Sequence, residues 1–179
     1  MSRLCGMTYR LGKFVDKSAP IKMYYSSVCS VLSYCIATWG GTMLCTRRAD
    51  HLLRLQKRIV TNLFSKFYPR SDNIFRDTSI IKIPDVYKLR VALYMYSIIV
   101  DKSIPSLKRQ LYLEYPEHNY DTRTANTLRL PFPRVEVIRM NFRYQFVNIW
   151  NGIPEDIKSK PSKKSFKRAY IQYIINNYD

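Results

Sequence analysis

The stretch YYSSVCSVLSYCIATWGGT, residues 24–42, decides which class of fold this chain adopts. It belongs to an uncharged segment, Met23 to Thr46, in a protein with 30 Lys and Arg residues, 13 Asp and Glu residues and a formal net charge of +17. A membrane-spanning helix needs about 20 predominantly apolar residues. Here serines and threonines are spread throughout, and the apolar residues recur at three- and four-residue spacing, which is typical of one stripe of a packed helix. We therefore favour a helix of a soluble bundle over a membrane span.

Helix start and stop signals extend this interpretation along the chain. Ser18 as a cap and Pro20 in the first turn predict a helix that ends at Gly40-Gly41. The other predicted helices cover 2–15, a segment from near Thr46 to before Pro69, 85–100, 142–150 and 163–178, with a helical turn after 104–105. Residues 112–133 are predicted as a loop and 135–142 as a short strand.

The predicted fold class is therefore mainly α. It consists of a helical bundle over 1–68, a helical connector packed on it over 69–110, and a basic region over 111–179. This last region combines a loop, a short strand or hairpin, and helices that include the C-terminal one.

The third predicted helix, RRADHLLRLQKRIVTNLF, has the clearest division into two faces. At 100° per residue, one side carries the apolar residues Leu52, Leu55, Ile59, Leu63 and Phe67. The opposite arc carries four cations, which are Arg47, Arg54, Lys57 and Arg58, with only Asp50 to balance them. The simplest interpretation is a solvated outer face. The alternative is a surface that contacts phosphates and releases counterions.

Two further sets of cations make nucleic acid the leading class of partner. The stretch KSKPSKKSFKR, residues 158–168, has six cations and no acid. A more dispersed set of arginines, 123–143, is interleaved with aromatic residues, which we expect to lie mainly in the core. Together the three clusters supply the predicted nucleic-acid-binding residues: Arg47, Arg54, Lys57, Arg58, Arg123, Arg129, Arg134, Lys163, Lys164, Lys167 and Arg168.

The sequence offers no catalytic or metal-binding motif. The four cysteines include no C-x-x-C pair, and neither histidine lies at a zinc-ligand spacing from them. We expect His51 to be structural and His118 to lie in a polar loop. The adjacent pair Glu155-Asp156 follows a proline and suits the start of a helical turn. We therefore expect no metal, no cofactor and no enzymatic activity of the chain itself. Free thiols in a reducing compartment, nuclear or cytoplasmic, are the expected state of the cysteines.

Blocks of residues that run in order along nearly the whole chain resemble one known family. The first blocks are IKMYYSSVCSVLSYCIATWGGT, with Tyr24, Leu32, Tyr34, Trp39 and Gly40, and then LQKRIV, with Leu55, Gln56, Lys57 and Arg58. The later blocks are IPDVYKLRVALYMY; the Ile-Pro pair at 104–105; HNYDTRTANTLRLPFPR; RYQFVNIWNGIPEDIK, with Trp150, Asn151, Pro154 and Ile157; and SFKR. In this order they resemble the end of the reverse transcriptase region of jockey-like non-LTR retrotransposons.

The chain departs from the family pattern at two places. Cys35 stands where the family usually has Gly after the tyrosine of the first block. Phe146-Val147 stand where Gly-Pro commonly precedes the late tryptophan.

The resemblance implies a thumb and the region after it. The polymerase palm, with its metal-binding aspartates, would lie N-terminal to Met1 in a complete element. A thumb is a helical bundle that grips the template–primer, so the expected partner is RNA or an RNA–DNA hybrid bound without sequence preference. The alternatives are a module that docks on an intact reverse transcriptase or another protein, a decayed transposon product without activity of its own, and a basic peripheral membrane protein.

Overall fold

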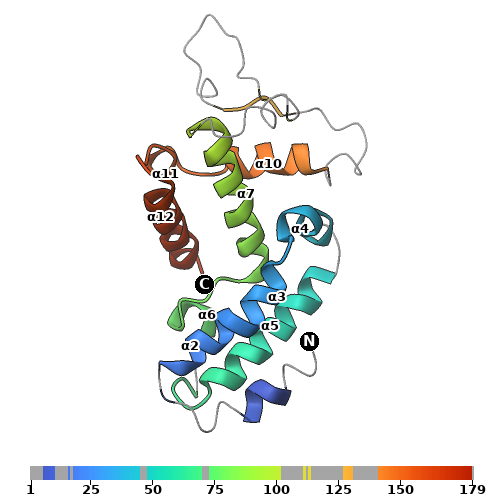
Figure 1. Cartoon of the computed structure of the whole chain (residues 1–179), viewed down its shortest axis with the longest axis vertical. Helices are drawn as coiled ribbons and strands as arrows, with labels where there is room; N and C mark the ends of the chain where they lie inside the picture. The colour runs from blue at the N-terminus through green and yellow to red at the C-terminus, as the bar shows by residue number, and fades with distance from the viewer. Residues whose placement is uncertain are drawn as a thin grey trace, which may run out of the picture. The chain divides into compact units, whose positions relative to one another are not determined.

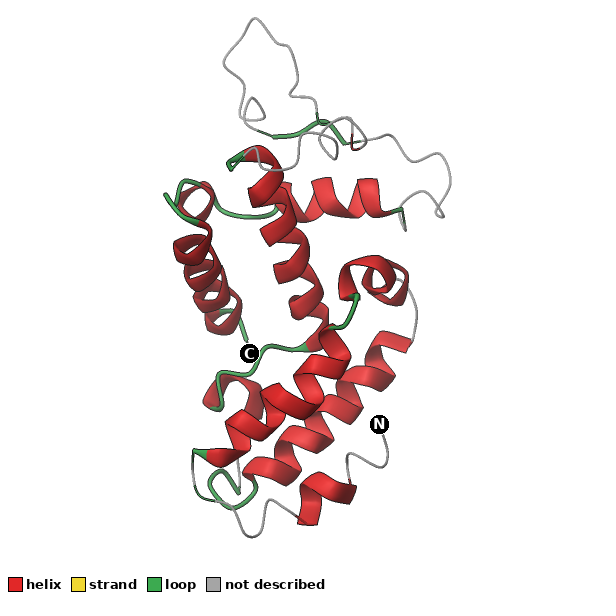
Figure 2. Cartoon of the chain, viewed as in Figure 1, coloured by secondary structure: helices red, strands yellow, loops and turns green. Residues whose placement is uncertain are grey.

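The computed structural model describes residues 6–10, 16, 18–44, 48–69, 73–101, 111, 113, 127–130 and 141–178. These residues form helices joined by turns and loops, and no strand occurs among them (Figure 2). The predicted mainly α class is therefore confirmed. The predicted helical turn after 104–105 lies outside the described residues, as do almost all of the predicted strand and most of the predicted loop.

The chain divides into two compact units. Unit 1 comprises Met1–Tyr87 and Ile171–Asp179, and unit 2 comprises Lys88–Tyr170. Both boundaries fall inside helices, which are α7 (Ile83–Ile99) and α12 (Lys163–Asn176). Each of these two helices therefore supplies residues to both units.

Unit 1 is built around two helical segments that run side by side in opposite directions (Figure 1). The first consists of α2 (Ala19–Met23), the π-helix η1 (Tyr24–Cys29) and α3 (Ser30–Ser33); the second is α5 (Arg48–Phe64). The helices α4 (Ile36–Leu44) and α6 (Ile74–Asp77) pack on α5, and residues 6–10 are also helical. As predicted, Pro20 lies in the first turn of α2, but Ser18 only occupies the cap position and its side chain makes no capping hydrogen bond.

The prediction that the second helix ends at Gly40-Gly41 is wrong. The helix breaks earlier, at Tyr34 and Cys35, and both glycines lie buried inside α4. Cys35 has a φ of 47°, in the left-handed region that favours glycine. Side chains of α4 hold this break, because Trp39 Nε1 donates to the Tyr34 carbonyl at 2.8 Å and Thr38 Oγ1 donates to the Cys35 carbonyl at 2.6 Å.

Gly40 serves close packing rather than helix termination. A Cβ atom at this position would lie 2.3 Å from Cδ2 of Tyr87, a distance that real Cβ contacts do not reach. The Tyr87 ring is fully buried against the backbone of α4 at this point. The missing side chain therefore sets how closely α4 and the first turns of α7 approach each other.

Serines in the uncharged segment bond to the backbone of their own helix. Ser26 Oγ donates to the Met23 carbonyl, and Ser30 Oγ donates to the Ser26 carbonyl. Such back-bonding removes the need for polar partners on neighbouring helices. The opposite side of the segment buries Tyr24, Val28 and Leu32 at four-residue spacing, so the segment is a packed amphipathic helix.

A single buried amide, Gln56 on α5, joins three parts of unit 1. Its Nε2 donates to Tyr24 Oη at 2.7 Å and to the Ile81 carbonyl at 2.8 Å, and its Oε1 accepts from the Ile83 backbone N–H at 2.9 Å. The Ile83 N–H belongs to the first residue of α7, where no intrahelical acceptor exists. Gln56 therefore fixes the place where α7 begins. Burial raises the pKa of Tyr24, which keeps its hydroxyl neutral.

Tyr178 attaches the C-terminal residues to the same region. Its hydroxyl accepts from the Lys82 backbone N–H at 2.8 Å and donates to Asp85 Oδ2 at 3.0 Å, and Lys82 Nζ lies 4.2 Å from the centre of its ring. Burial, followed by the negative charge of Asp85, raises the pKa of Tyr178. The tyrosine therefore stays a neutral donor at any physiological pH.

Unit 2 is organised around Phe166, a fully buried residue of α12. Its ring lies 4.7 Å from that of Tyr96 on α7, and 6.0 Å from the rings of both Trp150 and Tyr170. Trp150 belongs to α10 (Phe142–Asn151), which ends at Gly152 as predicted and is followed by α11 (Glu155–Lys158). The predicted cap of α12 is also present, because Ser162 Oγ accepts from the Ser165 backbone N–H at 3.2 Å.

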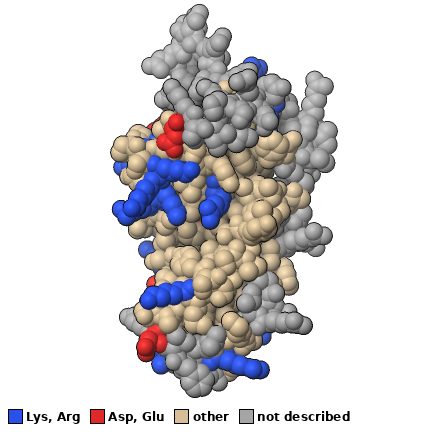
Figure 3. Space-filling model, in the orientation of Figure 1, with Lys and Arg blue, Asp and Glu red and all other residues tan. Residues whose placement is uncertain are grey.

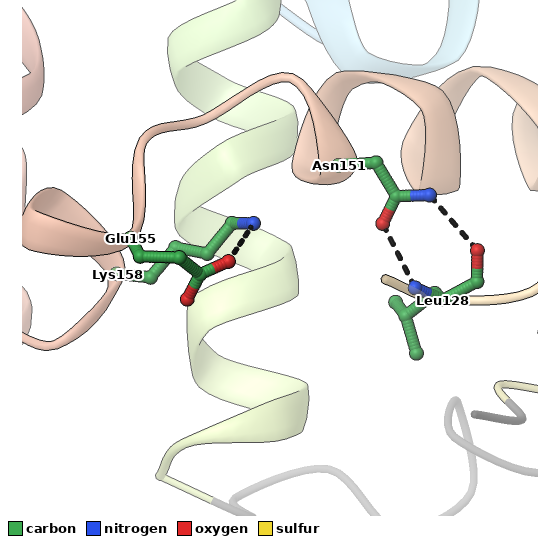
Figure 4. Close-up of polar contacts among 4 residues, drawn as sticks. All are labelled: Leu128, Asn151, Glu155 and Lys158. Atoms are coloured by element: carbon green, nitrogen blue, oxygen red, sulfur yellow. Dashed lines mark hydrogen bonds and ion pairs between the residues drawn. The ribbon is translucent and has the colours of Figure 1, made fainter. Parts of the chain in front are cut away.

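Asn151 holds the loop residues 127–130 against the end of α10. Its side chain donates to the Leu128 carbonyl at 2.9 Å and accepts from the Leu128 N–H at 3.0 Å (Figure 4). On α11, the buried Lys158 pairs with Glu155 at 2.8 Å and lies 5.7 Å from the centre of the Trp150 ring. These contacts hold residues 127–130 and α11 in place next to the C-terminal end of α10.

We expect Gln56→Leu to lower the free energy of unfolding by about 2–5 kcal/mol, because each buried group left without a partner costs about 1–3 kcal/mol. Urea denaturation followed by circular dichroism measures the change. The control is Gln172→Leu, at an exposed glutamine of α12. Equal stability of the two variants would contradict the role of the buried amide.

We expect Gly40→Ala to destabilise the protein by about 1–3 kcal/mol through overpacking against Tyr87. Gly152→Ala is the matched control, because a Cβ there meets only the Asn148 and Ile149 carbonyls, both at 3.6 Å. Thermal unfolding of both variants tests the difference. The close-packing account fails if the two substitutions have the same effect.

We expect Cys35→Gly to stabilise the protein by up to about 1 kcal/mol, since glycine removes the left-handed penalty but adds entropy to the unfolded chain. The same substitution at Cys29, whose φ is −65°, should destabilise by about 1 kcal/mol. Chemical denaturation of the two variants compares them. Shifts of the same sign would show that the backbone at Cys35 is not constrained in this way.

Candidate nucleic-acid interface

Three of the predicted cations form one exposed face of α5. Arg54, Lys57 and Arg58, here called the α5 cation face, are all exposed and lie within an arc of about 100°. Among the described residues no carboxylate forms an ion pair with any of them. The fourth predicted cation of this helix, Arg47, lies outside the described residues.

The opposite side of α5 explains why these cations point outward. Gln56, Ile59, Val60, Leu63 and Phe64 are buried. The buried side is therefore centred on Gln56 rather than on the predicted line from Leu52 to Phe67. Leu52 and Leu55 are only half-buried, and Phe67 follows the end of the helix. The error is modest, because the predicted apolar line lies near the edge of the true buried face.

His51, which we expect to be structural rather than catalytic, is exposed on α5. It lies seven residues before Arg58 and three before Arg54, so it borders the α5 cation face. The neighbouring leucines Leu52 and Leu53 are half-buried. His118 lies outside the described residues.

A second group of predicted cations lies on α12. Lys163, Lys164, Lys167 and Arg168, here called the α12 cation cluster, are exposed. The buried Phe166 and Tyr170 hold the helix in unit 2, which turns the cluster toward solvent. Figure 3 shows Lys and Arg side chains gathered where α12 begins, with another beside them over the middle of α7.

The dispersed third set of arginines is only partly described. Arg129 is exposed in the segment that Asn151 holds, whereas Arg123 and Arg134 lie outside the described residues. Of the accompanying aromatic residues, Phe142 is 53% exposed, contrary to the expectation of a core position, and Tyr144 is half-buried. The structure therefore places the α5 cation face in unit 1 and Arg129 in unit 2.

Two exposed residues of α7 are not among the predicted binding residues. The run VALYMYSIIV is apolar nearly all round, which predicts burial on most sides, and most of it is buried. Tyr94, however, is 45% exposed, and Arg90, one helical turn before it, is exposed as well. A tyrosine within an apolar run is predicted to be buried. The sequence pattern therefore does not distinguish the exposed Tyr94 from the buried Tyr96.

Within the part of the chain that the structure describes, no cluster of three or more His, Cys, Asp or Glu side chains could hold a metal ion. In the same part, no helix has both the length and the apolar character that crossing a membrane requires. No protein-family model, curated protein or solved structure matches this chain.

Proposed function

We propose that this chain binds the phosphate backbone of a template–primer, RNA or an RNA–DNA hybrid, without reading its sequence. In this proposal it corresponds to the thumb and following region of a jockey-like retrotransposon reverse transcriptase, an RNA-directed DNA polymerase, without the catalytic palm. In this proposal the binding takes place in the nucleus or cytoplasm, where such templates occur, and the polymerase chemistry belongs to the palm.

The observation that carries the proposal is the α5 cation face. Three exposed cations lie on one side of a long helix, and no described carboxylate pairs with them. Like charges gathered in this way repel one another, and a polyanion that binds them releases its condensed counterions. Contacts of Arg and Lys with phosphates fix position but carry no base information. Such a face therefore suits a sequence-independent grip.

The positions of the residues that carry the family resemblance also support the proposal. Tyr24, Gln56 and Ile83 belong to three successive blocks, and they meet in one buried hydrogen-bonded contact. Gly40 of the first block packs against Tyr87 of the third. Cys35, which replaces the glycine that the family usually has, has the left-handed backbone that glycine adopts most easily.

A protein-docking module is the second candidate, and exposed apolar side chains of unit 1 favour it. These are Met7, Tyr9, Tyr25, Val31 and Tyr34, the last of them 76% exposed. An intact reverse transcriptase would be the expected partner. Nuclease treatment of the purified protein separates the two candidates, since only a nucleic-acid binder should release bound nucleic acid.

We expect the triple variant Arg54→Ala, Lys57→Ala and Arg58→Ala to bind an RNA–DNA hybrid more weakly than the wild type. Each lost phosphate contact should reduce the slope of log K against log salt concentration by about 1, so the slope should fall by up to about 3. Fluorescence anisotropy with a labelled hybrid across a salt series measures both quantities.

The matched control removes the same charge elsewhere in unit 1. Lys22, Lys66 and Arg76 are exposed and lie outside α5, so their replacement by Ala changes the net charge equally. This control should leave the slope close to that of the wild type. If the α5 variant has an unchanged slope, or if both variants lose the same amount, the α5 cation face is not the binding surface.

A further inference from the structure

An exposed aromatic ring lies among cations on the surface of unit 2. Between Lys88 and Ile99, α7 is buried almost all round, yet Tyr94 leaves 45% of its surface exposed. The next exposed side chain toward the N-terminus on the same stripe is Arg90, four residues away. Ser97 continues this stripe, seven residues after Arg90.

A lysine of α12 is anchored to the same stripe. Lys163 Nζ donates a hydrogen bond to Ser97 Oγ, while the lysine remains exposed. Two contacts hold α12 beside α7 at this level: the ring contact between Tyr96 and Phe166 and the hydrogen bond from Tyr96 Oη to the Lys160 carbonyl at 2.6 Å. Lys167, one turn after Lys163, points to the same side of α12.

Because Ser97, to which Lys163 donates, lies three residues after Tyr94 on α7, we group four residues as one surface, here called the Tyr94 patch: Arg90, Tyr94, Lys163 and Lys167. All four belong to unit 2. Figure 3 shows cations over the start of α12 and over the middle of α7 on the same side of the molecule. Among the described residues no carboxylate forms an ion pair with the three cations; Glu155 pairs with Lys158, and Asp101 and Asp156 pair with none of the three.

An exposed aromatic ring beside cations favours a ligand that has both a flat ring and negative charge. An apolar partner would have to desolvate three cations, and a simple anion would gain nothing from the ring. An unpaired nucleotide uses both, because its base stacks on the ring and its flanking phosphates contact the cations. Bases within a duplex are already stacked on each other and cannot use the ring in this way.

We infer that the Tyr94 patch binds an unpaired nucleotide of a single-stranded extension that continues from the template–primer duplex. The inference rests on the proposed function and assigns to unit 2 a preference for single-stranded nucleic acid. Tyr94 supplies the stacking surface, and Arg90, Lys163 and Lys167 contact the adjacent phosphates.

The test compares two labelled probes, a blunt RNA–DNA hybrid and the same hybrid with a single-stranded extension, by fluorescence anisotropy at fixed salt. Tyr94→Ala should weaken binding of the extended probe by about fivefold to hundredfold, the equivalent of losing one stacked base, and should leave the blunt probe unchanged. Tyr94→Phe keeps the ring and should bind both probes like the wild type. Tyr173→Ala, at a 40% exposed tyrosine of α12 away from the patch, is the control for loss of an exposed ring.

The outcomes separate this inference from the proposed function. If Tyr94→Ala binds the extended probe like the wild type, or weakens both probes equally, stacking at Tyr94 is ruled out while backbone binding stands. If Tyr94→Phe loses as much affinity as Tyr94→Ala, the hydroxyl rather than the ring matters, and the inference is again wrong. If the wild type binds neither probe, the proposed function itself fails and this inference fails with it.

Discussion

The three hydrogen bonds of the Gln56 side chain are the constraint on which unit 1 depends. They connect η1, the segment before α7 and α5, which are far apart in the sequence. A buried amide with partners on three segments tolerates little displacement of any of them, because each lost bond leaves a buried polar group unsatisfied. The same contact orients α5. With Gln56 at the centre of its buried side, Arg54, Lys57 and Arg58 must face solvent.

In unit 2 a buried aromatic side chain, rather than a buried amide, fixes the orientation of the helix that carries the cations. Phe166 contacts Tyr96, Trp150 and Tyr170, and this packing fixes the rotation of α12 about its axis. The α12 cation cluster is then left on the surface, and Lys163 is held against Ser97. In each unit the packed interior therefore leaves cations exposed, and no described carboxylate pairs with those of the α5 cation face or the α12 cation cluster; this is a costly arrangement for a free protein and a favourable one beside a polyanion.

The periodicity of the sequence predicts many helices, helix ends and exposed faces correctly. It fails at residues whose burial or role depends on partners that are distant in the sequence. The exposed α5 cations, the Ser162 cap and the end of α10 at Gly152 follow from local patterns. Gly40 was read as a helix stop because only the buried Tyr87 ring shows that it serves close packing. The buried role of Gln56 is not predicted from the sequence, since its partners cannot be inferred from α5 alone. The exposure of Tyr94 is not predicted from the sequence, because it depends on which part of α7 the neighbouring helices leave uncovered.

The most direct test of the central claim is the affinity of the wild-type chain for two labelled RNA–DNA hybrids of equal length and unrelated sequence, measured across a salt series. Backbone recognition predicts the same affinity for both hybrids and the same steep linear fall of log K with log salt concentration. Absent binding, or binding that does not change with salt, would contradict the claim that the exposed cations grip phosphates. A strong preference for one hybrid would contradict the claim that the grip ignores sequence.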